Sequence, residues 1–106
     1  MWLFVMFDLP VKEKLDRKAA AQFRKSLEHD GFTMHQFSVY TRFCASLEAA
    51  QVHIRRIQSL LPEKGKVSIL MVTDKQYANI QNFWGAVEKK SGQFNYNSTF
   101  FDNFAA

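Results

Sequence analysis

The stretch WLFVMFDLP, residues 2–10, decides the fold of this chain. Six apolar residues run without a break, and a carboxylate follows at Asp8. An unbroken apolar run is typical of a strand buried on both faces, because a strand with one wet face alternates apolar and polar residues. Pro10 cannot donate to a sheet ladder, so the strand is predicted to end near Asp8. Asp8 is then either a helix cap or turn residue, or a metal or catalytic group at the rim of the sheet.

The composition fits a single domain with a core rich in aromatic side chains. Of the 106 residues, 47% are hydrophobic and 15% aromatic, and 11 are Phe. The 14 Lys and Arg against 10 Asp and Glu give a net charge of +4, which permits a nucleic-acid partner without requiring one. Cys44 is the only cysteine, so an intrachain disulfide is excluded and a reducing, cytoplasmic compartment is expected. The apolar run is too short for a membrane span and lacks the flanks of a signal peptide, so no membrane association is expected.

Residues 13–30 are predicted to form the first helix. Apolar residues recur every four positions, and the opposite side is basic. Gly31 is suited to the left-handed position that ends a helix. The predicted buried stripe is Leu15, Ala19, Phe23 and Leu27, and the basic residues opposite it are Lys14, Arg17, Lys18, Arg24 and Lys25.

Residues 46–61 are predicted to form the second helix. Ser46 is a good N-cap, and Pro62 stops the run. The apolar stripe expected to face the core runs from Leu47 to Leu61, and the wet side is expected to carry His53, Arg55 and Arg56.

The remaining segments read as strands and turns. Apolar residues in 32–44 switch parity midway, so one regular strand cannot contain them. A tight turn giving strands at 32–36 and 38–44 is predicted, and a bulge at the same place is the alternative. Residues 66–72 form a further strand, a capping box predicts a helical turn over 74–79, and 81–84 is expected to be a short strand.

The predicted order is β-α-β-β-α-β with an extra short C-terminal strand, which is the ferredoxin-like α+β arrangement. Both helices must pack on one face of the antiparallel sheet, yet the strands at 2–8 and 66–72 are apolar on both faces. A second copy of the sheet would cover the open face, so a two-fold homodimer is expected. Its axis would bring two Asp8 carboxylates together, which is costly unless they share a proton or a divalent cation.

The chain divides into a ferredoxin-like domain, residues 1–85, and a tail, residues 86–106. Five aromatic residues stand among polar ones in the tail, whereas disordered segments are poor in aromatics. The tail is therefore either a flexible segment or a peptide that docks on a partner.

The sequence carries no motif of a common catalytic type. Its four Gly are scattered, and His29, His35 and His53 are isolated from one another, so we interpret them as surface or packing residues. The basic side of the first helix is either a solvated face or, in a dimer, a stripe along a duplex backbone. The candidate nucleic-acid-binding residues are Lys14, Arg17, Lys18, Arg24 and, from the strand at 38–44, Arg42.

Three segments together resemble the small CRISPR-associated endoribonuclease family, the lesser subunit of the spacer-acquisition integrase complex. They are FDLP at residues 7–10, QFSVY at 36–40 and VTDKQ at 72–76. The resemblance is closest to members from type II systems and covers about residues 1–85.

The resemblance implies a ferredoxin-like two-fold dimer whose last short strand crosses to the partner's sheet. It implies that Asp8 is the ligand of a Mg²⁺ held between two protomers. It also implies metal-dependent cleavage of RNA or DNA, and a scaffold role in which the dimer binds double-stranded DNA between copies of the larger integrase subunit.

Two main hypotheses follow. The first is a dimeric, DNA-binding scaffold for spacer integration. The second is a Mg²⁺-dependent phosphodiesterase acting through Asp8. One acidic ligand per protomer is few for a nuclease, so the scaffold role is preferred and any hydrolysis is expected to be slow. A toxin-like ribonuclease on the same fold, or an RNA-recognition module that stacks bases on its strands, is the alternative.

Overall fold

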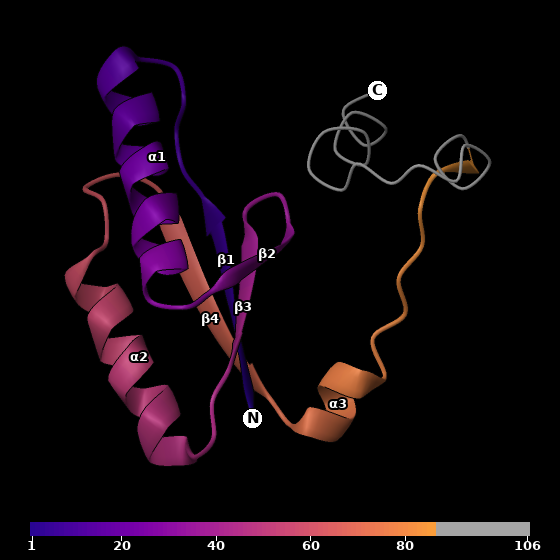
Figure 1. The fold of residues 1–106 in the computed structure, drawn as a ribbon. Helices are drawn as coiled ribbons and strands as arrows, with labels where there is room; N and C mark the ends of the chain where they lie inside the picture. Colours follow the sequence, from indigo (N-terminus) through magenta and orange to yellow (C-terminus); the bar gives the residue numbers. More distant parts are fainter. Residues whose placement is uncertain (87–106) are drawn as a thin grey trace.

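One antiparallel sheet of four strands, in the order β2-β3-β1-β4, organises the part of the chain that the structure describes, residues 1–86. The structure is a computed structural model. Figure 1 shows α1 and α2 on one face of the sheet, α1 towards the top of the view and α2 towards the bottom, with α3 on the other side. This is the expected α+β, β-α-β-β-α-β fold. Its elements are β1 (Trp2–Asp8), α1 (Lys14–His29), β2 (Thr33–Gln36), β3 (Val39–Phe43), α2 (Leu47–Ser59), β4 (Lys66–Val72) and α3 (Asp74–Ala78).

Strand β1 lies in the middle of the sheet, between β3 and β4, so the opening stretch of the sequence is the central element. Its burial alternates along the strand. Leu3 and Val5 are fully buried and Phe7 is nearly so, because these three point at α1 and α2. The residues between them are only half-buried in the single chain. The prediction of a strand buried on both faces therefore holds for one face alone in the described chain.

The core side of α1 differs from the predicted stripe. Phe23 and Leu27 are buried as expected, but Leu15 is 75% exposed and Ala19 is also exposed. The third buried residue is Ala20. The reason is geometric: with about 3.6 residues per turn, a repeat of four drifts around the helix and cannot stay on one face. Spacings of three and four must alternate, as they do between Ala20, Phe23 and Leu27.

The buried side of α2 also differs from the prediction. Its buried residues are Ala50, His53 and Ile57, whereas Leu47 and Leu61 are exposed. His53, which was predicted on the wet side, is only 7% exposed. Ser46 does cap the helix, since its hydroxyl accepts a hydrogen bond from the N–H of Ala49 at 3.1 Å.

The turn and the bulge that were alternatives between β2 and β3 are both present. The register shifts between Met34 and Gln36, and a tight turn with Ser38 at a φ of 64° follows. The apolar residues therefore divide between the two faces: Met34 packs against the core, whereas the register places Val39 opposite Met6 and Phe43 opposite Trp2 on the open face. Gly31, at a φ of 85°, ends the turn after α1 as predicted.

Beyond β4, the Thr73–Gln76 capping box predicted for α3 is formed. Residues 80–85 form no strand in the single chain, because a strand requires a neighbour to pair with. Nearly all of the predicted tail, residues 87–106, lies outside the described residues. Within residues 1–86, none of the helices has the length and hydrophobicity that crossing a membrane requires.

Candidate nucleic-acid interface

The sheet face turned away from α1 and α2 is largely apolar, with Thr41 and Ser68 as polar neighbours of Phe4 and Met6. From β1 it carries Trp2, Phe4 and Met6, which alternate with the buried residues. The neighbouring strands add exposed apolar groups: Phe43 of β3 is 47% exposed and Leu70 of β4 is 51% exposed. An apolar surface of this kind on a folded domain marks a contact surface.

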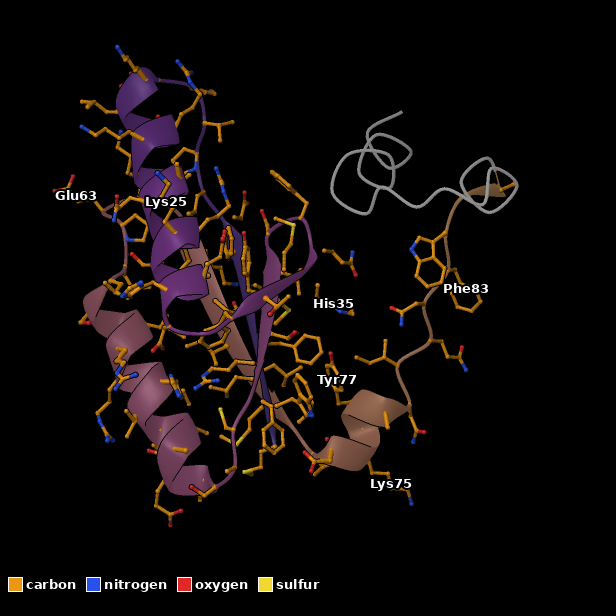
Figure 2. The ribbon with its side chains drawn as sticks, in the orientation of Figure 1. Lys25, His35, Glu63, Lys75, Tyr77 and Phe83 are labelled. Carbon is orange, nitrogen blue, oxygen red and sulfur yellow. The ribbon has the colours of Figure 1, made fainter. Side chains whose placement is uncertain are left out.

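Aromatic rings line this face in an ordered row. The Trp2 and Tyr77 rings stack with centroids 3.7 Å apart and planes 3° apart, and Phe43 meets Trp2 edge-on at 5.6 Å. Phe4 contacts Tyr77 at 5.9 Å and His35 at 5.8 Å. Figure 2 shows His35 and Tyr77 on the side of the sheet away from α1 and α2. Burial lowers the pKa of His35, so its imidazole is neutral at neutral pH.

Asp8 is exposed at the end of β1, on the same face as this aromatic row. Its strand neighbour is Lys66 of β4. Gly65, at a φ of 95°, lets the loop pass directly under Asp8, because a Cβ on Gly65 would lie 2.6 Å from the Asp8 carbonyl oxygen. On the other side, the N–H of Phe7 donates to the Ser38 carbonyl at 3.0 Å. Asp8 is therefore a fixed strand-end group, and α1 is capped by Glu13 instead.

The surroundings of Asp8 fit a shared cation site rather than a complete one. Residues 1–86 contain no group of three His, Cys, Asp or Glu side chains that could hold a metal ion. Mg²⁺ commonly takes one or two protein carboxylates and completes its shell with water and substrate phosphate. Asp8 supplies one such carboxylate from each chain, and a second copy of Asp8 would supply another.

The basic residues predicted on α1 divide into two groups. Lys14 and Lys18 are exposed, and with Lys25 they lie along one line of the helix. Arg17 is also exposed, but its Nη1 donates to the carbonyl oxygens of Val11 and Lys12 at 3.1 and 3.0 Å. It closes the loop before α1.

Arg24 and Arg42 are half-buried, so they are the least accessible of the five predicted residues. The sheet register places Arg42 opposite Leu3, on the helix-covered face. Its Nε donates to Nε2 of His53 at 3.0 Å. This geometry fits the packing of β3 against α2 better than contact with a phosphate.

A hydrogen-bonded chain behind Arg42 was missed at the level of sequence. Since Nε2 of His53 accepts from Arg42, Nδ1 carries the proton and donates to Oδ2 of Asp30 at 2.7 Å. The other oxygen, Oδ1, accepts from Nη1 of Arg56 at 2.7 Å. The chain joins β3, α2 and the C-terminal end of α1. The signal for it was the position of His53, three residues after Ala50 and four before Ile57, which is core spacing.

Asp30 is the charged centre of this chain and is fully paired. Burial alone would raise its pKa, but the hydrogen bonds from His53 and Arg56 and the nearby positive charge lower the pKa below its ordinary value. Only 14% of its side chain is exposed, against 57% for Arg56. Arg56 therefore emerges at the surface while the carboxylate that holds it stays inside.

Arg56 opens onto a groove between α1 and α2 with a volume of about 720 Å³. The groove has a mixed lining with hydroxyl groups and two basic side chains, those of Lys25 and Arg56. Its lining residues are Gln22, Lys25, Ser26, His29, Asp30, Arg56, Ser59 and Leu60.

Comparison with known proteins gives consistent relatives. Residues 1–80 match the family model described as CRISPR associated protein Cas2. A Flavobacterium psychrophilum protein named CRISPR-associated endoribonuclease Cas2 is 51% identical over 85 residues, which are 80% of this chain and 74% of the relative. A protein of the same name from Parvibaculum lavamentivorans is 46% identical over 93 residues, 88% of this chain and 92% of the relative.

Among solved structures, the chain resembles the crystal structure of Streptococcus pyogenes Cas2 at pH 6.5. The TM-score is 0.59 at 20% sequence identity, and the match covers 78% of this chain and 99% of that chain. At this identity the likeness concerns the fold alone.

Proposed function

This chain belongs to the CRISPR-associated Cas2 family, and from that premise we propose that it acts in spacer acquisition as a two-fold dimer. The dimer binds duplex DNA and serves as a scaffold for the larger integrase subunit. The observation that carries the proposal is the apolar sheet face that α1 and α2 leave uncovered. Such a face is costly in a free monomer, and a second copy of the same sheet would offer an equally apolar face to cover it.

The segment after α3 supports the same assembly. Figure 2 shows Phe83 on a stretch that leaves the domain, and this side chain is 76% exposed. Strand β4 forms an outer edge of the sheet and is seven residues long, with backbone groups free to pair. In the proposed dimer, residues 81–84 of one protomer would pair with β4 of the other, so that the backbone groups of both segments form hydrogen bonds.

The DNA-binding part of the proposal rests on the exposed line of Lys14, Lys18 and Lys25 on α1. Their spacing of four and seven residues keeps them on one side of the helix, over about 16 Å at 1.5 Å per residue. A row of ammonium groups on one side suits phosphate contact, which needs positive charge and carries no sequence information.

Duplex binding measured against salt concentration tests this part. Combined Lys14→Ala and Lys18→Ala substitution should reduce the slope of log affinity against log salt by about two per bound protomer. The matched control removes two exposed charges elsewhere, through Arg55→Ala and Lys75→Ala, and should change the slope less. If the two double variants showed the same slope of log affinity against log salt, the line of lysines on α1 would be rejected as the DNA contact. Co-purification with the larger integrase subunit tests the scaffold role directly.

A second candidate function is Mg²⁺-dependent endonuclease or endoribonuclease activity. The observation that favours it is the exposure of Asp8 on the face proposed to meet its own copy. Two facing carboxylates would hold the cation, which when bound supplies polarisation of a phosphate group. Lys66, beside Asp8 in the register, would orient a phosphate by its charge.

Asp8→Asn separates the two candidates. With RNA and DNA substrates in the presence of Mg²⁺ or a chelator, the nuclease candidate requires cleavage that the substitution abolishes. The scaffold candidate requires integration that survives it. Cleavage by the Asp8→Asn protein would remove Asp8 from the chemistry.

A further inference from the structure

The groove between α1 and α2 presents positive charge to solvent although it contains a carboxylate. Both oxygens of Asp30 are already bonded, one to His53 and one to Arg56, and its side chain is 14% exposed. Arg56 is 57% exposed in the same groove, beside Lys25. The negative charge is thus turned inward, and the cations face outward.

Arg56 is held in place from behind. Its Nη1 is bonded to Asp30, Asp30 is bonded to His53, and His53 in turn accepts from Arg42 on β3. A guanidinium has five N–H groups, so one bond to Asp30 leaves the others for a ligand. An arginine whose rotamer is already fixed loses less conformational freedom on binding than a free one.

Lys25 connects this groove to the DNA-binding line of α1. It belongs to the same exposed line as Lys14 and Lys18, and it also lines the groove that Arg56 enters from α2. Figure 2 shows Lys25 on α1, on the side of the molecule away from Tyr77. The positive surface therefore continues from α1 across the groove onto α2.

We infer that the α1–α2 groove binds the nucleic-acid phosphate backbone through Arg56, with Asp30 and His53 as positioning residues. This inference rests on the proposed DNA-binding function and extends its contact surface beyond α1. The convergence of the C-terminal ends of α1 and α2 gives a further reason for cations to gather here. If Arg56 served only to neutralise the C-terminal ends of the two helices, its replacement would leave DNA binding unchanged.

The first test compares neighbouring arginines in the full chain. Arg56→Ala should weaken duplex binding several-fold and reduce the salt slope by about one per bound protomer. Arg55→Ala removes an equal charge from the adjacent exposed position outside the groove, and should have the smaller effect on both quantities. Equal effects of the two substitutions overturn the inference while leaving the proposed function intact. Absence of duplex binding by the unmodified protein overturns both.

The second test uses Asp30→Asn, for which positioning and simple charge make opposite predictions. Removing a negative charge from the groove should tighten DNA binding if charge alone matters. If Asp30 positions Arg56, binding should weaken while the salt slope stays unchanged, because every cation is still present. The double variant Asp30→Asn with Arg56→Ala should bind no more weakly than Arg56→Ala alone. Tighter binding by Asp30→Asn, in a protein whose circular dichroism is native, overturns the positioning role.

Discussion

Alternate residues of β1 lie on the two faces of the central sheet, yet the two faces differ in how far their side chains are buried within one chain. On the helix-covered face, Leu3 and Val5 are fully buried within one chain. On the other face, Trp2, Phe4 and Met6 are half-buried, and Leu70 of the neighbouring strand is 51% exposed. The first face is completed by the protomer itself, whereas the second is only partly covered within residues 1–86, by Tyr77 of α3 against Trp2 and Phe4.

This difference explains why the opening run is apolar without interruption. A strand with one solvent face would place polar residues at alternate positions. Apolar residues at every position indicate that both faces are used for packing, although the long helices α1 and α2 lie on one side and only the short α3 lies on the other. In the proposed assembly that packing is the dimer contact, and Asp8 stands at its rim.

The largest effect is expected on the covered face. Leu3→Ala should lower the free energy of unfolding by about 2–5 kcal/mol, because it leaves a cavity in a fully packed core. Chemical denaturation at two protein concentrations measures it. The loss should be the same at both concentrations, whereas Phe4→Ala, on the other face, should show a loss that depends on concentration. Identical behaviour of the two variants would break the distinction between the faces.

The next effect concerns the polar chain at the edge of the covered face. His53→Ala leaves Asp30 and Arg42 without their shared partner, so the free energy of unfolding should fall by about 1–3 kcal/mol. Thermal or chemical unfolding measures it. If the substitution did not change the free energy of unfolding, water would replace the imidazole without loss. The hydrogen bonds from Arg42 to Arg56 would then not contribute to stability.

The sequence predicted the element order and most boundaries, because caps, glycines and prolines act locally. Ser46, Thr73 and Gly31 each mark the helix end or start that was expected of them. The burial of helix faces was less predictable. Leu15 and His53 were assigned to the wrong sides, because the side that faces the sheet depends on how each helix is rotated against it.

The candidate site was predictable only in part. Asp8 could be located from the end of the apolar run, but the sequence could not separate a cap from a rim carboxylate. Arg42 was chosen for its charge, and its contact with His53 comes from elements that are distant in sequence. The chain from Arg42 to Arg56 depends on three elements meeting, which no local pattern encodes.

A smaller effect is expected from removing the charge of Asp30. Its pKa is lowered in the folded protein, so it adds stability above its unfolded pKa, and that stability is lost as the pH falls through the folded pKa. Asp30→Asn should therefore cost about 1 kcal/mol at neutral pH and flatten the stability curve below about pH 4. Unfolding measured across acid pH checks this. If the stability of Asp30→Asn fell with acid pH as steeply as that of the unmodified protein, the loss of stability in acid would come from other carboxylates.

The smallest effect is expected at Leu15, which the helical repeat predicted to be core. Because its side chain is 75% exposed, Leu15→Ala should change the free energy of unfolding by less than about 0.5 kcal/mol. Leu27→Ala, on the same helix but fully buried, is the matched comparison and should cost about 2–5 kcal/mol. Similar losses at the two positions would mean that α1 packs on the sheet through a different side.

We propose that the uncovered face joins two copies of the chain, and the molar mass in solution tests this claim. Light scattering of the unmodified protein should give twice the mass of one chain. Leu70→Asp, which places a charge on the uncovered face, should give a folded monomer, while Leu15→Asp, an equal change on the helix side, should remain a dimer. A dimer that survives Leu70→Asp, or a monomer for the unmodified protein, would contradict the claim.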